Sequence, residues 1–127
     1  MTWTAMVAAA LALWGAVFPG QVTVVNQDGV AAYANVTSIA WADRWSEAPN
    51  CIISVMPLKM AYLTHEQIQR VITHEVGHCF GFEHDSTRPG IMYPDGAQYD
   101  LNGYDRAALW RITGAPYRLA VPGIAAD

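Results

Sequence analysis

The sequence has few charged residues, and their scarcity limits the partners that the protein can have. Charged residues make up 14% of the 127 positions, and the seven basic side chains are scattered without forming a cluster. With a net charge of -4 and a pI near 5.4, the chain offers no electrostatic surface for nucleic acid or anionic membranes. A hydrophobic content of 53% excludes a disordered chain, and the length suits one domain over residues 1–127.

The sequence also lacks an apolar run long enough to cross a bilayer. Residues 5–18 are apolar and uncharged, but a spanning helix needs roughly 20 such residues. A signal peptide is the alternative, yet no Lys or Arg precedes the segment and no clear small-x-small cleavage site follows it. Large side chains recur every three or four residues, at Trp3, Val7, Leu11, Trp14 and Phe18. This spacing favours a buried core helix that ends at Pro19-Gly20.

Only two cysteines are present, Cys51 and Cys79. Cys51 falls in a predicted strand and Cys79 in a predicted helix that should pack on the sheet. A disulfide and two buried free thiols are both compatible with this arrangement. A disulfide implies an oxidising compartment, so we expect a secreted or otherwise extracytoplasmic protein.

Histidine is scarce too, and three of the four histidines fall within one short segment. His74, Glu75 and His78 form a His-Glu-x-x-His motif, and His84 follows. Residues four apart lie on the same face of a helix, so His74 and His78 can direct their imidazoles at one point. A catalytic zinc typically has three protein ligands and one open position. The segment therefore predicts a zinc site with His84 as the third ligand.

Two further residues extend this motif. To bring His84 back to the same ion, the chain must leave the helix after His78, and Gly81 tolerates the positive φ that such a turn needs. A turn with the sequence Gly-Ile-Met-Tyr-Pro follows at positions 90–94 and contains Met92. The five-residue motif alone occurs by chance on surface helices, whereas the extended pattern makes coincidence improbable.

With these residues the chain resembles the metzincin metalloendopeptidases, and most of all their matrixin branch. The matching positions are His74, Glu75, His78, Gly81, His84 and Met92. The resemblance implies one catalytic Zn²⁺ held by the three histidines, with Glu75 as the general base toward a zinc-activated water and Met92 in a tight turn beneath the metal. It implies a zinc-dependent endopeptidase that hydrolyses protein or peptide substrates.

Two positions bear on the subfamily. Asp85, after the third histidine, is similar to the adamalysins rather than to the matrixins. Its carboxylate is expected to bond the backbone of the Met92 turn or, alternatively, to pair with Arg88. Astacins and serralysins place a metal-directed tyrosine two residues after the methionine, and this chain has Pro94 there. Tyr93 is structural if the matrixin resemblance holds.

The matrixin resemblance also implies a substrate pocket, with Arg70, Tyr93 and Pro94 as candidate residues. Arg70 lies one turn before His74 on the same helical face, a position that borders the S1′ pocket in matrixins, where its side chain would shorten the pocket. A solvated arginine is the alternative. The resemblance further makes residues 39–43 an edge strand beside the cleft, where an extended peptide could add its backbone antiparallel. Alternatively, Trp41 and Trp45 simply cover the core.

The expected fold is α+β, a small metzincin-like domain. Strands are predicted at residues 22–25, 33–36, 39–43 and 51–56, so the mixed twisted sheet should have about four strands. It should pack on the N-terminal helix and on an active-site helix that begins at a capping box formed by Thr64 and Gln67. A C-terminal helix from about Asn102 to Gly114 should lie below the cleft. Metzincins usually begin with a strand before the first helix, so either the sheet is one strand short or upstream sequence is missing.

We expect the protein to act as a monomeric enzyme on a protein or peptide, without a nucleic-acid or membrane partner. The alternative is a catalytically silent, zinc-stabilised protein-binding module. Glu75 argues against that module, because a structural zinc site normally has four protein ligands and needs no such carboxylate. His65, the remaining histidine, is expected to be solvated on the first helical turn.

Overall fold

The computed structural model describes residues 2–45 and 50–113 and places them in an α+β fold. The described helices and strands are α1 (Trp3–Trp14), β1 (Val22–Asn26), the 3-10 helix η1 (Ala31–Tyr33), β2 (Ala40–Trp45), β3 (Asn50–Val55), the 3-10 helix η2 (Pro57–Met60), α2 (His65–Cys79) and α3 (Gly103–Thr113). Within these residues, three α-helices accompany one three-stranded mixed sheet. This architecture is consistent with the predicted small metzincin-like domain.

The sheet is organised around β3, its central strand. β1 pairs with β3 in parallel, and β2 pairs with β3 antiparallel. Alternate side chains of a strand face the same side, and on β3 the fully buried ones are Cys51, Ile53 and Val55. Over the residues that the structure describes, β2 is an edge strand, as predicted from residues 39–43.

The fourth strand predicted at residues 33–36 is wrong. Residues 31–33 form η1, where the Tyr33 N–H donates to the Val30 carbonyl, and the Val36 N–H donates back to the Tyr33 carbonyl. Backbone donors bonded within the segment are not available to a neighbouring strand. The aromatic side chain of Tyr33 instead packs edge-on against Trp41, with ring centroids 5.0 Å apart. The side chain of Trp45 lies outside the described part of the structure.

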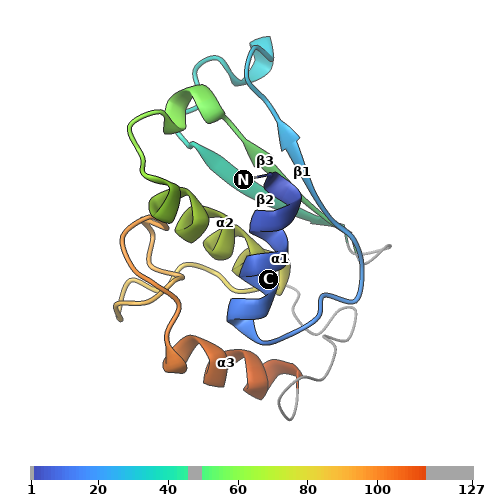
Figure 1. Ribbon diagram of the computed structural model, residues 1–127, viewed down its shortest axis with the longest axis vertical. Helices are drawn as coiled ribbons and strands as arrows, with labels where there is room; N and C mark the ends of the chain where they lie inside the picture. Colours follow the sequence, from blue (N-terminus) through green and yellow to red (C-terminus); the bar gives the residue numbers. More distant parts are fainter. Residues whose placement is uncertain (1, 46–49, 114–127) are drawn as a thin grey trace.

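α1 and α2 lie side by side on the same face of the sheet (Figure 1). α1 begins at Thr2, whose hydroxyl accepts the Ala5 N–H. It ends at Gly15 rather than at the predicted Pro19-Gly20, because Gly15 adopts a φ of 73° and donates its N–H to carbonyls of the last turn. A glycine in this left-handed conformation closes a helix. α1 is nevertheless a core helix as predicted, with Ala10 and Trp14 fully buried.

α2 carries the His-Glu-x-x-His motif and has a well-defined start. The Thr64 hydroxyl accepts the Gln67 N–H, while the Gln67 side-chain oxygen accepts the Thr64 N–H. This reciprocal pair confirms the predicted capping box. Val71, Ile72 and Val76 then bury one face of the helix and hold it against the rest of the core.

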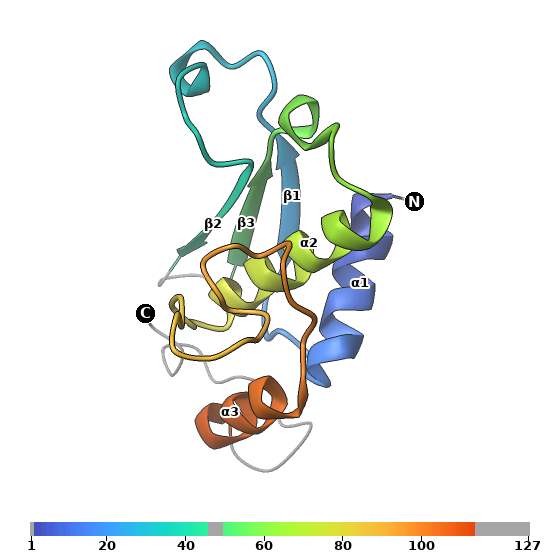
Figure 2. The ribbon, with the colours of Figure 1, turned by 90° about the vertical axis from the view of Figure 1, so that its left-hand side faces the viewer.

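α3 lies at the end of the molecule away from the sheet (Figure 2). Asn102 caps it, since the Asn102 side chain accepts the Asp105 N–H and the Asp105 carboxylate accepts the Asn102 N–H. Arg106 donates from Nε to the Leu13 carbonyl and so ties α3 to the end of α1. The predicted start near Asn102 agrees with the structure, whereas the predicted end at Gly114 lies outside the described residues. None of the described helices has the length and apolar character needed to cross a membrane.

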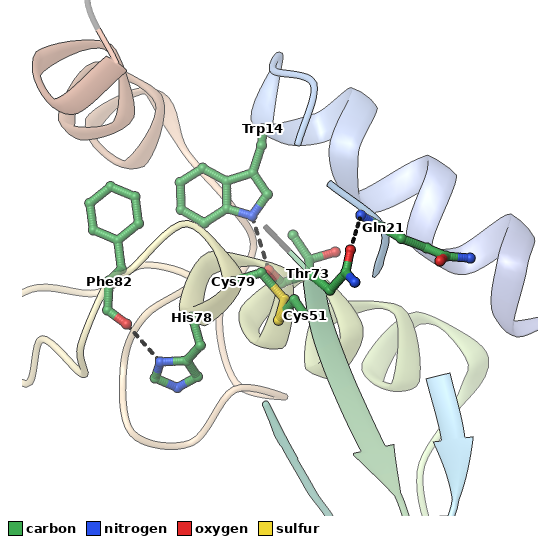
Figure 3. Close-up of a disulfide and its surroundings, with 8 residues drawn as sticks. Trp14, Gln21, Cys51, Thr73, His78, Cys79 and Phe82 are labelled. Carbon is green, nitrogen blue, oxygen red and sulfur yellow. Dashed lines mark hydrogen bonds between the residues drawn. A yellow bond between two sulfur atoms is a disulfide. The ribbon is translucent and has the colours of Figure 1, made fainter. Parts of the chain in front are cut away.

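A disulfide joins Cys51 of β3 to Cys79 at the end of α2, with Cα atoms 5.6 Å apart. Both residues are fully buried. Of the two alternatives that the sequence left open, the structure has the bridge. The bridge fastens the last turn of α2, next to His78, to the central strand of the sheet (Figure 3).

Replacing Cys51 and Cys79 together with alanine should lower the free energy of unfolding by about 3 to 4 kcal/mol. The bridge closes a loop with a sequence separation of 28, and opening such a loop returns conformational entropy to the unfolded chain. Urea unfolding followed by circular dichroism measures the difference. A reducing agent should destabilise the wild type but not the double variant, and equal unfolding midpoints for all samples would argue against the bridge.

Candidate metal centre

Three imidazoles converge at the end of α2. His74 and His78 lie one helical turn apart, and His84 approaches from the segment after the helix. One ring nitrogen from each lies within 4.8 Å of the others, and the Nε2 atoms of His74 and His84 are 3.2 Å apart. Two nitrogen ligands of a tetrahedral zinc are about 3.3 Å apart when each is about 2.0 Å from the ion. The donor set and its spacing fit a metal ion.

Gly81 returns the chain toward the two helical histidines. Its φ is 97°, a conformation that a residue with a Cβ rarely adopts. Beyond it, the Phe82 N–H donates to the Gly77 carbonyl at 3.1 Å, which folds the chain back on the last turn of α2. The glycine turn predicted between His78 and His84 is therefore present.

Two of the three imidazoles are bonded through their outer nitrogens to backbone carbonyls. His74 Nδ1 lies 2.6 Å from the Ile91 oxygen, and His78 Nδ1 lies 2.6 Å from the Phe82 oxygen. Because a carbonyl oxygen only accepts, each Nδ1 carries the proton and donates it. Nε2 of each neutral ring then keeps its lone pair, which is the form that binds a metal.

Burial keeps these imidazoles neutral. Desolvation lowers the pKa of His74 to about 4, against a smaller opposing effect of the hydrogen bond to Ile91. Desolvation also lowers the pKa of His78, and the neighbouring His84 adds to this effect because two imidazolium charges repel. In the metal-free protein at neutral pH, protons therefore do not compete with a metal at these two rings.

Glu75 is a buried carboxylate next to His74 on the same helix. Its side chain is 5% exposed, and Oε1 has no hydrogen-bond partner among the described residues. Desolvation raises the pKa of the Glu75 carboxyl to about 8. An unpartnered buried carboxylate is costly unless a nearby charge or hydrogen bond compensates it. A cation at the histidine cluster supplies such a charge, so Glu75 also fits a metal at this place.

Met92 packs beneath α2 in the turn predicted from the sequence. It is 5% exposed, and a Cβ built on Gly77 would lie 2.3 Å from its sulfur. The Tyr93 N–H donates to the Gly90 carbonyl across the turn, and the Met92 carbonyl accepts the Asp85 N–H at 2.8 Å. Glycine at position 77 is what allows Met92 to approach the helix so closely.

Asp85 reaches the Met92 turn through its backbone and not through its carboxylate. The carboxylate accepts the N–H and the hydroxyl of Thr87, which lowers the pKa of Asp85. The predicted side-chain bond from Asp85 to the turn is therefore wrong, because the nearer Thr87 donors occupy it. Arg88, the alternative partner, lies with its guanidinium 4.3 Å from the centre of the Tyr104 ring.

Sequence analysis missed two residues that hold His74. A Cβ built on Gly96 would lie 2.7 Å from His74 Cγ, so the backbone at Gly96 packs directly on the imidazole. Asp105 of α3 is 6% exposed and accepts the Ile91 N–H, and Ile91 in turn accepts from His74. In the sequence, Gly96 looks like an ordinary turn glycine after Asp95. Asp105 looks like an ordinary acidic residue in the first turn of a helix. Neither local pattern indicates a contact with the metal site.

Replacing Gly96 with alanine should weaken zinc binding about tenfold or more, since the added methyl group displaces the His74 ring from its place. Competition with a fluorescent chelator measures the change in Kd. Gly103→Ala is the matched control, because a Cβ at Gly103 meets nothing within 4 Å. Equal zinc affinity in the two variants would show that the contact between Gly96 and His74 does not position the ligand.

The three candidate pocket residues do not line one cavity. Arg70 pairs with Asp100 at 2.7 Å and lines a cavity of about 450 Å³ between α1, α2 and residues 91–101. The lining of that cavity includes neither Tyr93 nor Pro94, and none of the three histidines. Tyr93 instead packs edge-on against Tyr99, with ring centroids 5.1 Å apart, and Pro94 is exposed. His65 is exposed on the first turn of α2, as predicted.

Part of this chain is similar to karilysin. Karilysin from Tannerella forsythia, a metalloprotease, is 34% identical over 59 residues, which are 45% of this chain and 12% of karilysin. No family model matches the sequence, and no solved structure matches the chain. Together with the histidine cluster, the likeness to karilysin supports a metalloprotease.

Proposed function

We propose that this protein is a zinc-dependent endopeptidase of the metzincin type, matrixin-like, with residues 1–127 as its catalytic domain. The observation that carries the proposal is the cluster of His74, His78 and His84, together with the buried carboxylate of Glu75, the residue after His74, whose Oε1 has no partner among the described residues. Three imidazoles leave an open position on a tetrahedral ion, whereas a structural zinc normally has four protein ligands. The likeness to karilysin supports the same class of reaction.

The side chains of the site have distinct roles in this proposal. His74, His78 and His84 bind the metal, and the carbonyls of Ile91 and Phe82 orient the first two rings. Zinc, when bound, makes a water nucleophilic near neutral pH and polarises the scissile carbonyl. The Glu75 carboxylate accepts the proton of the attacking water and later donates it to the leaving amine nitrogen. Glu75 is thus the general base and then the general acid.

An extended peptide substrate is proposed to bind along β2. β2 lies at an edge of the described sheet, antiparallel to β3, and it packs against α2. A free strand edge offers backbone donors and acceptors to an added strand. This geometry suits a polypeptide substrate in extended conformation.

Arg70 is proposed to limit the depth of the S1′ pocket. Its ion pair with Asp100 and its bond to the Ala97 carbonyl hold the guanidinium in place one helical turn before His74. Arg70→Leu should therefore increase cleavage before bulky P1′ residues, which a peptide library with varied P1′ positions measures. Gln98→Leu is the control, because Gln98 is exposed and does not line the cavity that Arg70 lines. A cleavage profile that does not change on Arg70→Leu would remove Arg70 from the pocket.

We propose a secreted or otherwise extracytoplasmic monomer. The disulfide between Cys51 and Cys79 supports this location, since such bridges form and persist in oxidising compartments.

Hydrolysis of a quenched fluorescent peptide library tests the proposed function. We expect cleavage that stops when EDTA is added and returns when Zn²⁺ is restored. Zinc binding without any chelator-sensitive cleavage would instead favour the catalytically silent binding module. Both outcomes require a measured zinc content of the purified protein.

A further inference from the structure

Trp14, the last residue of α1, makes three contacts with the region of the metal centre although it lies 59 positions before Thr73. The side chain is fully buried. Its indole Nε1 donates to the Thr73 carbonyl at 3.0 Å, immediately before His74. Its ring stacks on Phe82 with centroids 5.4 Å apart and planes 7° from parallel, and it also contacts Phe80. Figure 3 shows the indole beside Phe82, with the Phe82 carbonyl directed at the His78 ring.

The stack on Phe82 affects the metal ligand His78 through the Phe82 backbone carbonyl. The Phe82 carbonyl accepts the hydrogen bond from His78 Nδ1 at 2.6 Å. That bond selects the tautomer and the orientation of the imidazole. Phe82 lies just after the end of α2, and the next two residues, Glu83 and His84, are exposed. A buried ring that holds the Phe82 side chain therefore also holds the carbonyl that orients His78.

The hydrogen bond from Trp14 to the Thr73 carbonyl fixes the indole to α2. An indole has a single N–H donor, and here it meets a carbonyl of the same helix that carries His78. The N–H edge of the indole is thus held by α2, while a face of the ring stacks on Phe82. Together with the bond from the Phe82 N–H to the Gly77 carbonyl, these contacts hold Phe82 next to the last turn of α2.

A purely space-filling role is the alternative, and the surrounding core shows what such a role looks like. Phe18 meets Phe80 edge-on at 5.7 Å, fills the same core and is 6% exposed. Phe18 makes no stack with Phe82 in the described structure. Phe18 therefore provides a comparison for a residue that supports the core alone.

We propose that Trp14 is a positioning residue for the metal centre, which it serves by stacking on Phe82 and thereby holding the carbonyl that orients His78. This inference rests on the proposed function, because it takes His78 to be a metal ligand. Outer contacts that orient metal-binding histidines typically change metal affinity by about 10- to 100-fold when removed. The stack should have an effect at the lower end of that range, since its removal loosens the carbonyl without deleting it.

The experiment compares Phe82→Leu with Phe18→Leu. Both exchange a phenyl ring for an apolar branched side chain, but only the first removes the stack on Trp14. Zn²⁺ affinity is measured by chelator competition, and exchange of the His78 Nδ1 proton is measured by NMR on the zinc-loaded protein. We expect Phe82→Leu to bind Zn²⁺ about tenfold more weakly and to exchange that proton faster. Phe18→Leu should lower thermal stability only, and Phe82→Tyr, which keeps the stack, should bind as the wild type does.

Two results would overturn the inference. The first is that Phe82→Leu keeps wild-type Zn²⁺ affinity. The second is that Phe18→Leu loses as much Zn²⁺ affinity as Phe82→Leu, which would mean that affinity depends on the stability of the core. Trp14→Leu removes the other partner of the stack and should weaken Zn²⁺ binding by a similar factor. Combining Trp14→Leu with Phe82→Leu should cause no further loss of affinity. If Trp14→Leu does not fold, the comparison of the two phenylalanine variants still decides. A wild-type protein that binds no Zn²⁺ would instead contradict the proposed function itself.

Discussion

Glu75→Gln is expected to lower kcat/KM for peptide hydrolysis by about a thousandfold while the protein retains its zinc. Glutamine has nearly the shape of glutamate but cannot accept the proton of the attacking water, and general acid–base catalysis contributes about 10²- to 10⁴-fold. Glu75→Ala should behave in the same way. Steady-state kinetics with a cleavable peptide and the zinc content of the purified variants are the measurements.

Glu83→Gln is the matched control for this substitution. Glu83 lies in the same segment but is exposed, so its loss should leave activity unchanged. Full activity in Glu75→Gln would rule out Glu75 as the general base. Loss of both zinc and activity would assign the carboxylate to metal binding.

Glu75→Gln is also expected to change how the stability of the metal-free protein depends on pH. Burial raises the pKa of Glu75 from 4.5 in the reference state to about 8 in the fold. A group with a raised folded pKa contributes its full stability below the unfolded pKa and loses it as pH rises through the folded value. In EDTA, thermal stability of the wild type should therefore fall between about pH 4.5 and 8 relative to Glu75→Gln. Parallel Tm curves for the two proteins would show that Glu75 is not buried as described.

His84→Ala is expected to reduce zinc affinity by more than about 100-fold. Loss of a group that only orients a ligand costs up to about 100-fold, and this substitution deletes a direct ligand. His84 is exposed, so the fold should tolerate the change. Chelator competition gives the Kd, and metal analysis gives the zinc content.

His65→Ala is the control for the His84 variant. It removes the fourth histidine, which is exposed at the start of α2 and outside the histidine cluster. We expect its zinc affinity to match that of the wild type. One tightly held zinc per chain in His84→Ala would contradict the three-histidine site.

The features of α2 that the sequence predicted are those that depend on short-range geometry. The spacing of His74 and His78 places two rings on one helical face, because a helix repeats every 3.6 residues. Thr64 and Gln67 form their reciprocal cap within a single turn. Gly81 is required by a backbone conformation that few other residues adopt. Each of these relations joins residues only a few positions apart.

The wrong predictions are those in which local hydrogen bonds, or a residue that ends a helix earlier, determined the structure. Residues 33–36 have the composition of a strand, but their backbone donors are bonded within the η1 turn. The first helix ends at Gly15, since a glycine C-cap acts before the proline at position 19 is reached. Asp85 bonds Thr87, two residues away, rather than the Met92 turn. Hydrophobic periodicity does not contain this information.

The α+β class and the set of residues that can form a metal centre follow from the sequence alone, because strand alternation, helical spacing and a glycine turn are properties of short segments. The packed domain was needed to show which carbonyls orient His74 and His78, that Cys51 meets Cys79, and that Trp14 packs on Phe82. Apart from the bond between His78 and Phe82, which lie four positions apart, these contacts join segments that are far apart in the chain, and their geometry depends on how α1, α2 and the sheet pack together. The ligands were therefore readable from local pattern, whereas the groups that hold them in place follow from the packing of the whole domain.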